Sequence, residues 1–122
     1  MLAYVTLGTN NKEKAVAFYD AVLGEMGAKR VFNNDRLQFY GVSMGQPMLA
    51  IGDPWDKGSA SCGNGVMPAL AVDSREMVDK VYAKAMELGA PDEGAPGERM
   101  PTFYGAYFRD PDGNKICVCK LG

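Results

Sequence analysis

Two segments of the chain follow the same order of features: an apolar strand, a polar helix cap, an amphipathic helix and a glycine that ends it. The first copy begins at Leu2 and the second at Met67. The aligned pairs are Leu7 with Leu70, Lys12 with Arg75, Glu13 with Glu76 and Tyr19 with Tyr82, and EMGA at 25–28 matches ELGA at 87–90. A long repeat indicates two copies of one supersecondary unit, which restricts the fold more than any other feature.

Each copy is followed by further strand patterns. In the first half, the pattern predicts a strand over 2–8, a helix over 12–26 and strands near 29–33, 36–42 and 47–51. In the second half, a helix follows Asp73 and Ser74. The Pro- and Gly-rich loop 91–101 has room for a short edge strand. Strands over 103–109 and 115–121 are joined by the tight turn Asp-Pro-Asp-Gly-Asn at 110–114.

The sequence therefore predicts an α+β fold of two βαβββ modules, at about 1–54 and 65–122, within one domain of 122 residues. A helix covers only one face of an antiparallel strand group. We expect the modules to form a curved mixed β-sheet whose bare face is a trough, with both helices outside. Such a trough is the default place for a ligand.

Three motifs carry a family resemblance across almost the whole chain: YVTLGTNNKEKAVAFYDAVLGEMGA, APDEGAPGERM and YFRDPDGNKI. With these motifs, the chain resembles the vicinal oxygen chelate superfamily, which includes glyoxalase I, extradiol dioxygenases and the bleomycin and fosfomycin resistance proteins. The resemblance implies the glyoxalase/bleomycin resistance fold and a homodimer. Side-by-side modules and modules swapped between chains both stay open.

In metal-dependent members, the resemblance implies four ligands, mostly His, Glu or Gln. Here the corresponding positions are Tyr4, Met67, Cys117 and a fourth-strand residue near Leu49, or Met48 or Ala50 if the register slips. The chain has no histidine. Hard and borderline divalent ions prefer carboxylate and imidazole groups, so we expect no metal and no cofactor. A soft-metal site of Met67, Cys117 and Cys119 is the alternative.

Alternation along the strands places polar and aromatic side chains at the trough. On the third strand we expect Arg36, Gln38 and Tyr40 to face the trough, and Leu37 and Phe39 to face the helix. Which side of 103–109 faces inward stays open. The residues predicted to bind a ligand are Tyr4, Thr6, Arg36, Gln38, Tyr40, Met67, Tyr107 and Cys117.

The cysteines do not provide an obvious nucleophile. Cys117 and Cys119 alternate with apolar residues, so both face one side of the last strand, and no histidine can lower their pKa. We expect structural thiols and no catalytic residue. Three cysteines without framework spacing fit a reduced, cytoplasmic protein.

We therefore expect a metal-independent protein that binds a small aromatic or amphipathic molecule. One alternative is a glyoxalase- or dioxygenase-like enzyme with an altered site, and another is a degenerate interaction domain. The net charge of −2, without clustered cations, argues against nucleic acid as a partner. The chain has no apolar run long enough to span a membrane and no signal peptide pattern at its N-terminus.

Overall fold

A computed structural model describes all residues from Met1 to Gly122. Its elements run in the order β1 (Tyr4–Gly8), α1 (Lys12–Glu25), β2 (Lys29–Asn33), β3 (Leu37–Gly41), β4 (Met48–Gly52), β5 (Ala69–Ala71), α2 (Arg75–Glu87), β6 (Asp92–Met100), β7 (Phe103–Arg109) and β8 (Lys115–Leu121). The predicted fold class, two βαβββ modules of an α+β protein, is confirmed. No helix is both long and apolar enough to cross a membrane.

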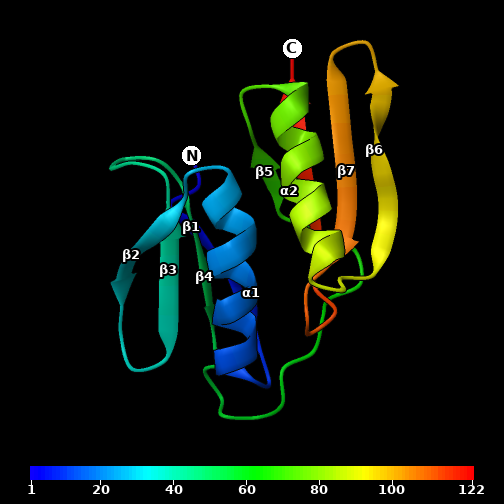
Figure 1. Cartoon of the computed structure of the whole chain (residues 1–122). Helices are drawn as coiled ribbons and strands as arrows, with labels where there is room; N and C mark the ends of the chain where they lie inside the picture. The colour runs from blue at the N-terminus through cyan, green and yellow to red at the C-terminus, as the bar shows by residue number, and fades with distance from the viewer.

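The modules form two separate four-stranded mixed sheets, in the orders β1-β4-β3-β2 and β5-β8-β7-β6. In each sheet the first strand pairs in parallel with the fourth, and the other neighbours are antiparallel. Strands β1 and β5 are edge strands, each paired with one neighbour only. The predicted curved sheet therefore consists of two sheets that are not hydrogen-bonded to each other at these edges. Figure 1 shows α1 and α2 side by side in front of the sheets.

Local sequence explains where the helices begin and end. Asn11 caps α1, its side chain accepting a hydrogen bond from the Lys14 N–H, and Ser74 caps α2 in the same way through Met77. Gly27 and Gly89 follow the helices with φ of 83° and 85°, a conformation that glycine adopts without strain.

One hydrophobic core joins the modules. The buried stripes of both helices pack against one face of each sheet, and the ring centroids of Phe18 on α1 and Phe108 on β7 lie 6.3 Å apart. The turn at 110–114 reinforces this junction: the Tyr19 hydroxyl donates to Asp110 Oδ2 at 2.7 Å, and Asn114 Nδ2 donates to the Gly8 carbonyl at 3.1 Å.

The loop expected over 91–101 is instead mostly strand. β6 spans nine residues and pairs with β7, with register shifts around Gly94, Gly97 and Met100. β-Bulges explain the difference, because they accommodate Gly and Pro96 within a strand that local propensity disfavours.

Candidate functional site

The side of the first sheet away from α1 carries an aromatic surface. Tyr4 and Thr6 lie here opposite Met48 and Ala50 in the β1–β4 register. We call this surface face A; its residues are Tyr4, Thr6, Phe32, Leu37, Phe39, Met48 and Ala50. The Phe39 ring is 5.0 Å from that of Tyr4 and 5.4 Å from that of Phe32, measured between centroids. Tyr4 and Phe32 are about half exposed, at 48% and 58%.

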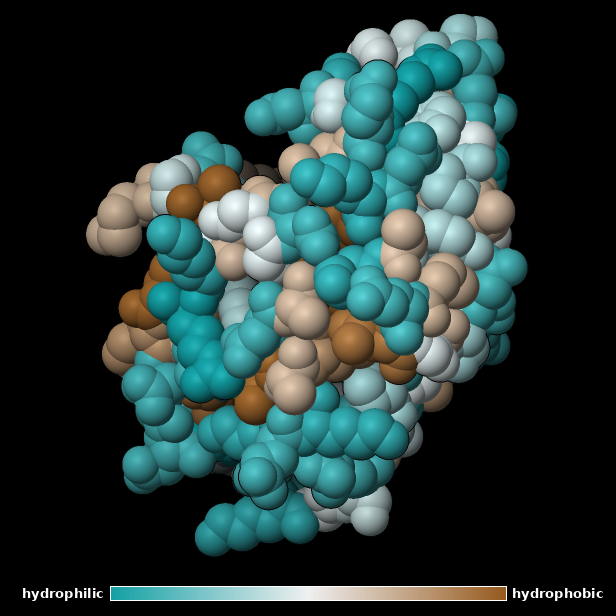
Figure 2. Space-filling model, in the orientation of Figure 1, coloured by the Kyte–Doolittle hydropathy of each residue, from teal (hydrophilic) through white to brown (hydrophobic).

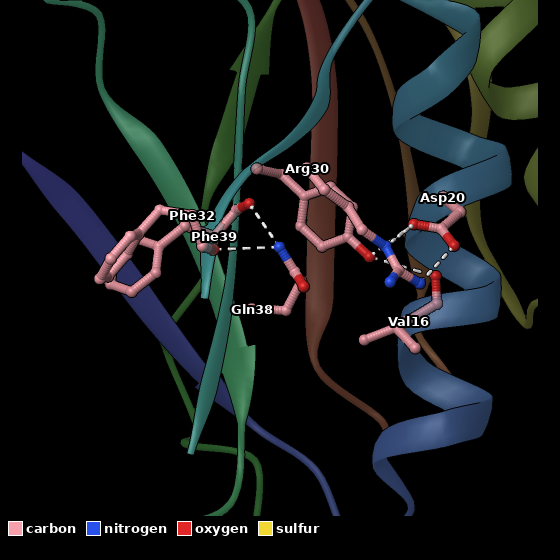
Figure 3. A network of polar contacts seen from close by, with 7 residues as sticks. Val16, Asp20, Arg30, Phe32, Gln38 and Phe39 are labelled. Carbon is pink, nitrogen blue, oxygen red and sulfur yellow. Dashed lines mark hydrogen bonds and ion pairs between the residues drawn. The ribbon is translucent and has the colours of Figure 1, made fainter. Parts of the chain in front are cut away.

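The predicted orientation of β3 is wrong. Gln38 and Tyr40 face α1, whereas Leu37 and Phe39 belong to face A. Figure 3 shows Gln38 on the helix side of the strand and the rings of Phe32 and Phe39 on the opposite side. A side-chain hydrogen bond to α1 explains the reversal, because Tyr40 Oη donates to Asp20 Oδ1 at 2.9 Å. Gln38 lies on the same side by alternation, and its Nε2 donates to the Phe32 carbonyl on β2 at 3.0 Å.

Arg36, which was expected to face the trough with Gln38 and Tyr40, lies just before β3 and contacts the linker between the modules instead. Its Nη1 donates to the Asp53 carbonyl at 2.9 Å, and its guanidinium lies 5.4 Å from the centre of the Trp55 ring. Trp55 is 83% exposed. This contact holds the linker beside β3.

The Asp20 carboxylate is the acceptor in the polar cluster behind β3. Arg30 donates to both of its oxygens, at 2.9 and 2.7 Å, and the Arg30 guanidinium is the largest cause of the lowered Asp20 pKa. Figure 2 shows apolar residues at the edge of the molecule over β2, where Val31 and Phe32 are exposed. The ion pair between Arg30 on β2 and Asp20 on α1 holds this strand against the helix.

We expect Asp20→Asn to remove part of the loss of stability in acid. The folded pKa is lowered, so the ionised carboxylate stabilises the protein above its unfolded pKa, about 4, and that contribution disappears as pH falls through the folded value. The pair is largely exposed, so the effect at pH 7 should be about 1 kcal/mol or less. Urea midpoints of the variant and the wild type at pH 7 and pH 3 measure the effect. If the midpoint fell by the same amount between pH 7 and pH 3 in both proteins, this role of Asp20 would be contradicted.

The second sheet carries a different surface on the side away from α2. We call it face B; its residues are Arg99, Phe103, Gly105, Tyr107, Lys115, Cys117 and Cys119. In the register, Tyr107 lies opposite Cys117, and Gly105 lies opposite Cys119. The alternate residues, including Ala106 and Phe108, are in the core, which fixes the orientation of β7 that the sequence left open. Met67 is 39% exposed just before β5.

The predicted residues therefore fall into separate groups. Tyr4 and Thr6 lie on face A, Tyr107 and Cys117 lie on face B, and Gln38 and Tyr40 lie behind β3. Arg99 and Lys115 were not among the predicted ligand-binding residues, Arg99 because it was assigned to a loop and Lys115 because a single lysine beside Cys117 was weak support. Each cation lies over the Tyr107 ring, at 5.4 and 5.6 Å from its centre.

Cys117 is a buried, protonated thiol. Burial, then the neighbouring Cys119, raises its pKa to about 12, so little thiolate forms near neutral pH. We expect a thiol reagent at pH 7.5 to modify exposed Cys62 rapidly in the native protein, and Cys117 and Cys119 at least about tenfold more slowly. Mass spectrometry of peptides after timed labelling checks this order. Rapid labelling of Cys117 would contradict it, and labelling in denaturant is the control for total thiol.

The side chains at the family's metal-ligand positions do not fit a metal ion. Leu49 lies in the core, so the fourth-strand position on face A is Met48 or Ala50. These groups, with Tyr4, Met67 and Cys117, include no imidazole and no carboxylate. No three His, Cys, Asp or Glu side chains are placed to hold an ion. We therefore assign no chemical step to a metal.

A cavity lies between the modules, near the C-terminal end of α1. Its volume is about 600 Å³, and apolar residues such as Leu23, Met26, Leu70 and Met77 form most of its wall. Of the predicted ligand-binding residues only Tyr40 lines it. The two ends of the junction between the modules differ. Near the N-terminal end of α1, hydrogen bonds join the turn at 110–114 to Gly8 and Asn10. At the cavity end, the turn between β3 and β4 forms no hydrogen bond with the second module.

The chain matches the family model described as the Glyoxalase/Bleomycin resistance protein/Dioxygenase superfamily over residues 1–118. No curated protein matches it. Among solved structures, a glyoxalase/bleomycin resistance protein from Albidiferax ferrireducens T118 is 35% identical, with a TM-score of 0.89, and the alignment covers 100% of this chain and 99% of that one.

Two further structures show the breadth of the similarity. A lactoylglutathione lyase from Agrobacterium tumefaciens is 25% identical with a TM-score of 0.70, covering 98% of this chain and 92% of that one. A superfamily member from Sphaerobacter thermophilus DSM 20745 is also 25% identical, with a TM-score of 0.71 and coverages of 98% and 96%. The description of the Agrobacterium structure names an enzymatic activity, whereas the descriptions of the other two structures name the family.

Proposed function

Since the chain belongs to the glyoxalase/bleomycin resistance protein/dioxygenase superfamily, we propose that it binds a small aromatic or amphipathic molecule reversibly, without a metal ion. One observation carries the proposal. Faces A and B retain aromatic side chains on the family scaffold, while the positions for metal ligands hold groups unsuited to a divalent ion. Aromatic side chains with a few polar groups are typical of small-molecule sites.

We also propose that a second copy of the chain completes the site. Face A and face B each lie on one side of a sheet that no helix of the chain covers. Tyr4 and Phe32 are exposed on face A, and Met67 is exposed just before β5; exposed apolar groups of this kind are typical of association or ligand surfaces. The proposed homodimer would place face A of one protomer near face B of its partner. The three free thiols support a reducing, cytoplasmic location.

The test is a ligand screen on untagged, chelator-treated protein. A tag is omitted because its histidines would supply ligands that the chain lacks. A ligand at about 100 times its Kd should raise the free energy of unfolding by about 2.7 kcal/mol. Tyr4→Ala and Tyr107→Ala should each weaken binding at the faces. Leu70→Trp, which narrows the cavity between the modules, should leave it unchanged.

Two results would count against the proposal. If only Leu70→Trp abolished binding, the ligand would occupy the cavity between the modules. If binding or turnover required added metal, the alternative of an enzyme with an altered site would lead; the similarity to a lactoylglutathione lyase is the observation that favours it. The raised pKa of Cys117 disfavours a version of that enzyme with a thiolate nucleophile.

A further inference from the structure

Face B contains two cations directed at one aromatic ring. β7, which carries Tyr107, lies between β6 and β8. Arg99 reaches the ring from β6, with its guanidinium carbon 5.4 Å from the ring centre, and Lys115 reaches it from β8, with Nζ at 5.6 Å. The Tyr107 ring is therefore approached by a positive charge from each neighbouring strand.

Two glycines of β6 make room for Arg99. A Cβ at Gly97 would lie 2.6 Å from Arg99 Nη1, and a Cβ at Gly94 would lie 3.2 Å from Nη2 and 2.9 Å from Tyr107 Cδ2. The guanidinium lies over these residues and donates one hydrogen bond, to the Ala95 carbonyl at 2.7 Å. The backbone of β6 thus positions Arg99 beside the ring.

Neither cation has an acidic partner. Arg99 and Lys115 take part in none of the ion pairs of the structure, and Arg109 nearby uses the carboxylate of Glu93 at 3.1 Å. No carboxylate of the chain therefore offsets either charge, and a bound anion within reach of both cations would do so. Cys117 and Cys119 are buried on this face, whereas Arg99 is exposed and Lys115 is half-buried, so both charged groups are accessible to a ligand.

We propose that face B selects a planar organic carboxylate. Arg99 and Lys115 bind the carboxylate, and the Tyr107 ring packs against the flat part of the molecule. Guanidinium pairs with carboxylate through two parallel hydrogen bonds, and aromatic rings pack well against flat ligands. This inference rests on the proposed function, since it names the chemical class of ligand for the same site.

The experiment is a titration of chelator-treated protein with benzoate, its neutral analogue benzamide, and inorganic phosphate, followed by backbone NMR shifts of β6–β8. We expect benzoate to bind more tightly than benzamide and the difference to shrink in high salt. Arg99→Gln and Lys115→Gln should each weaken benzoate by about tenfold. Lys80→Gln, an equal charge change on exposed α2, is the matched control and should have no effect.

Each other outcome overturns a different claim. Equal binding of benzamide and benzoate, unaffected by Arg99→Gln, would leave small-molecule binding intact and overturn the preference for an anion. Phosphate that displaces benzoate and binds as tightly would make face B a simple anion site. If no organic molecule binds to faces A and B in this titration or the wider screen, the proposed function fails and this inference with it. Unfolding midpoints of all three variants should match the wild type, because the substituted side chains are not in the core.

Discussion

Replacing Asp110 with alanine is expected to lower the free energy of unfolding by about 3–5 kcal/mol, a large part of the stability of a domain this size. The Asp110 carboxylate is 3% exposed and accepts hydrogen bonds from the Tyr19 hydroxyl at 2.7 Å, from the N–H groups of Asp112 and Asn114 at 2.9 Å, and from Asn114 Nδ2 at 2.9 Å. The substitution removes four bonds at once.

The loss is large because the partners stay buried. Tyr19 is fully buried in the core, so its hydroxyl has no route to water once Asp110 is gone. Burial, then the Asp110 charge, raises the pKa of Tyr19, so the hydroxyl keeps its proton and needs an acceptor. The turn therefore joins the modules as well as reversing the chain.

Asp112→Ala in the same turn is the matched control. The Asp112 carboxylate accepts one exposed hydrogen bond, from the Asn10 N–H at 2.9 Å, so its loss should cost about 1 kcal/mol or less. Urea unfolding of both variants measures the two effects. Equal midpoints for the two variants would contradict the special position of Asp110.

Gly52→Ala is expected to destabilise the protein by about 3 kcal/mol, or to prevent folding. A Cβ at this position of β4 would overlap the backbone carbonyl oxygen of Arg36 and would lie 2.9 Å from Leu37 Cδ2. The carbonyl belongs to the backbone just before β3, so it cannot move aside as a flexible side chain could. Gly52 is thus required where β3 and β4 meet.

Gly24→Ala provides the opposite control. Gly24 lies in α1, and nothing comes within 4 Å of a Cβ built there. Alanine in a helix should raise the free energy of unfolding by about 0.5–1 kcal/mol, because glycine loses more backbone entropy on folding. Thermal unfolding of both variants should move in opposite directions. A shift in the same direction would refute the packing argument for Gly52.

The repeat and the turn chemistry were enough to predict most of the fold. Strands β2, β7 and β8 have the predicted bounds, and α1 differs by one residue at its end. The glycines after both helices and the turn at 110–114 act locally, which is why local sequence locates these elements. The length of β6 was underestimated, since only a short edge strand was expected there, because its pairing with β7 overrides the poor strand propensity of its Gly and Pro residues.

The orientation of strands was harder to predict. Alternation divides β3 into two sets, but the side that faces the helix depends on a distant partner, Asp20 on α1, which accepts the Tyr40 hydroxyl. The signal in the sequence was Asp20 itself, a polar residue next to the buried stripe of α1 that could accept a hydrogen bond from a strand facing the helix. The pairing of Arg99 with Tyr107 required knowledge of the β6–β7 register, which bulges shift.

The most direct test of metal independence is the metal content of untagged protein that has been exposed to zinc, nickel, manganese and iron salts and then desalted. Plasma mass spectrometry should find only traces, because the donor groups at the family positions suit none of these ions. The same preparation should still bind its organic ligand. One firmly held ion per chain would contradict the account and would place this protein with the metal-dependent members of its superfamily.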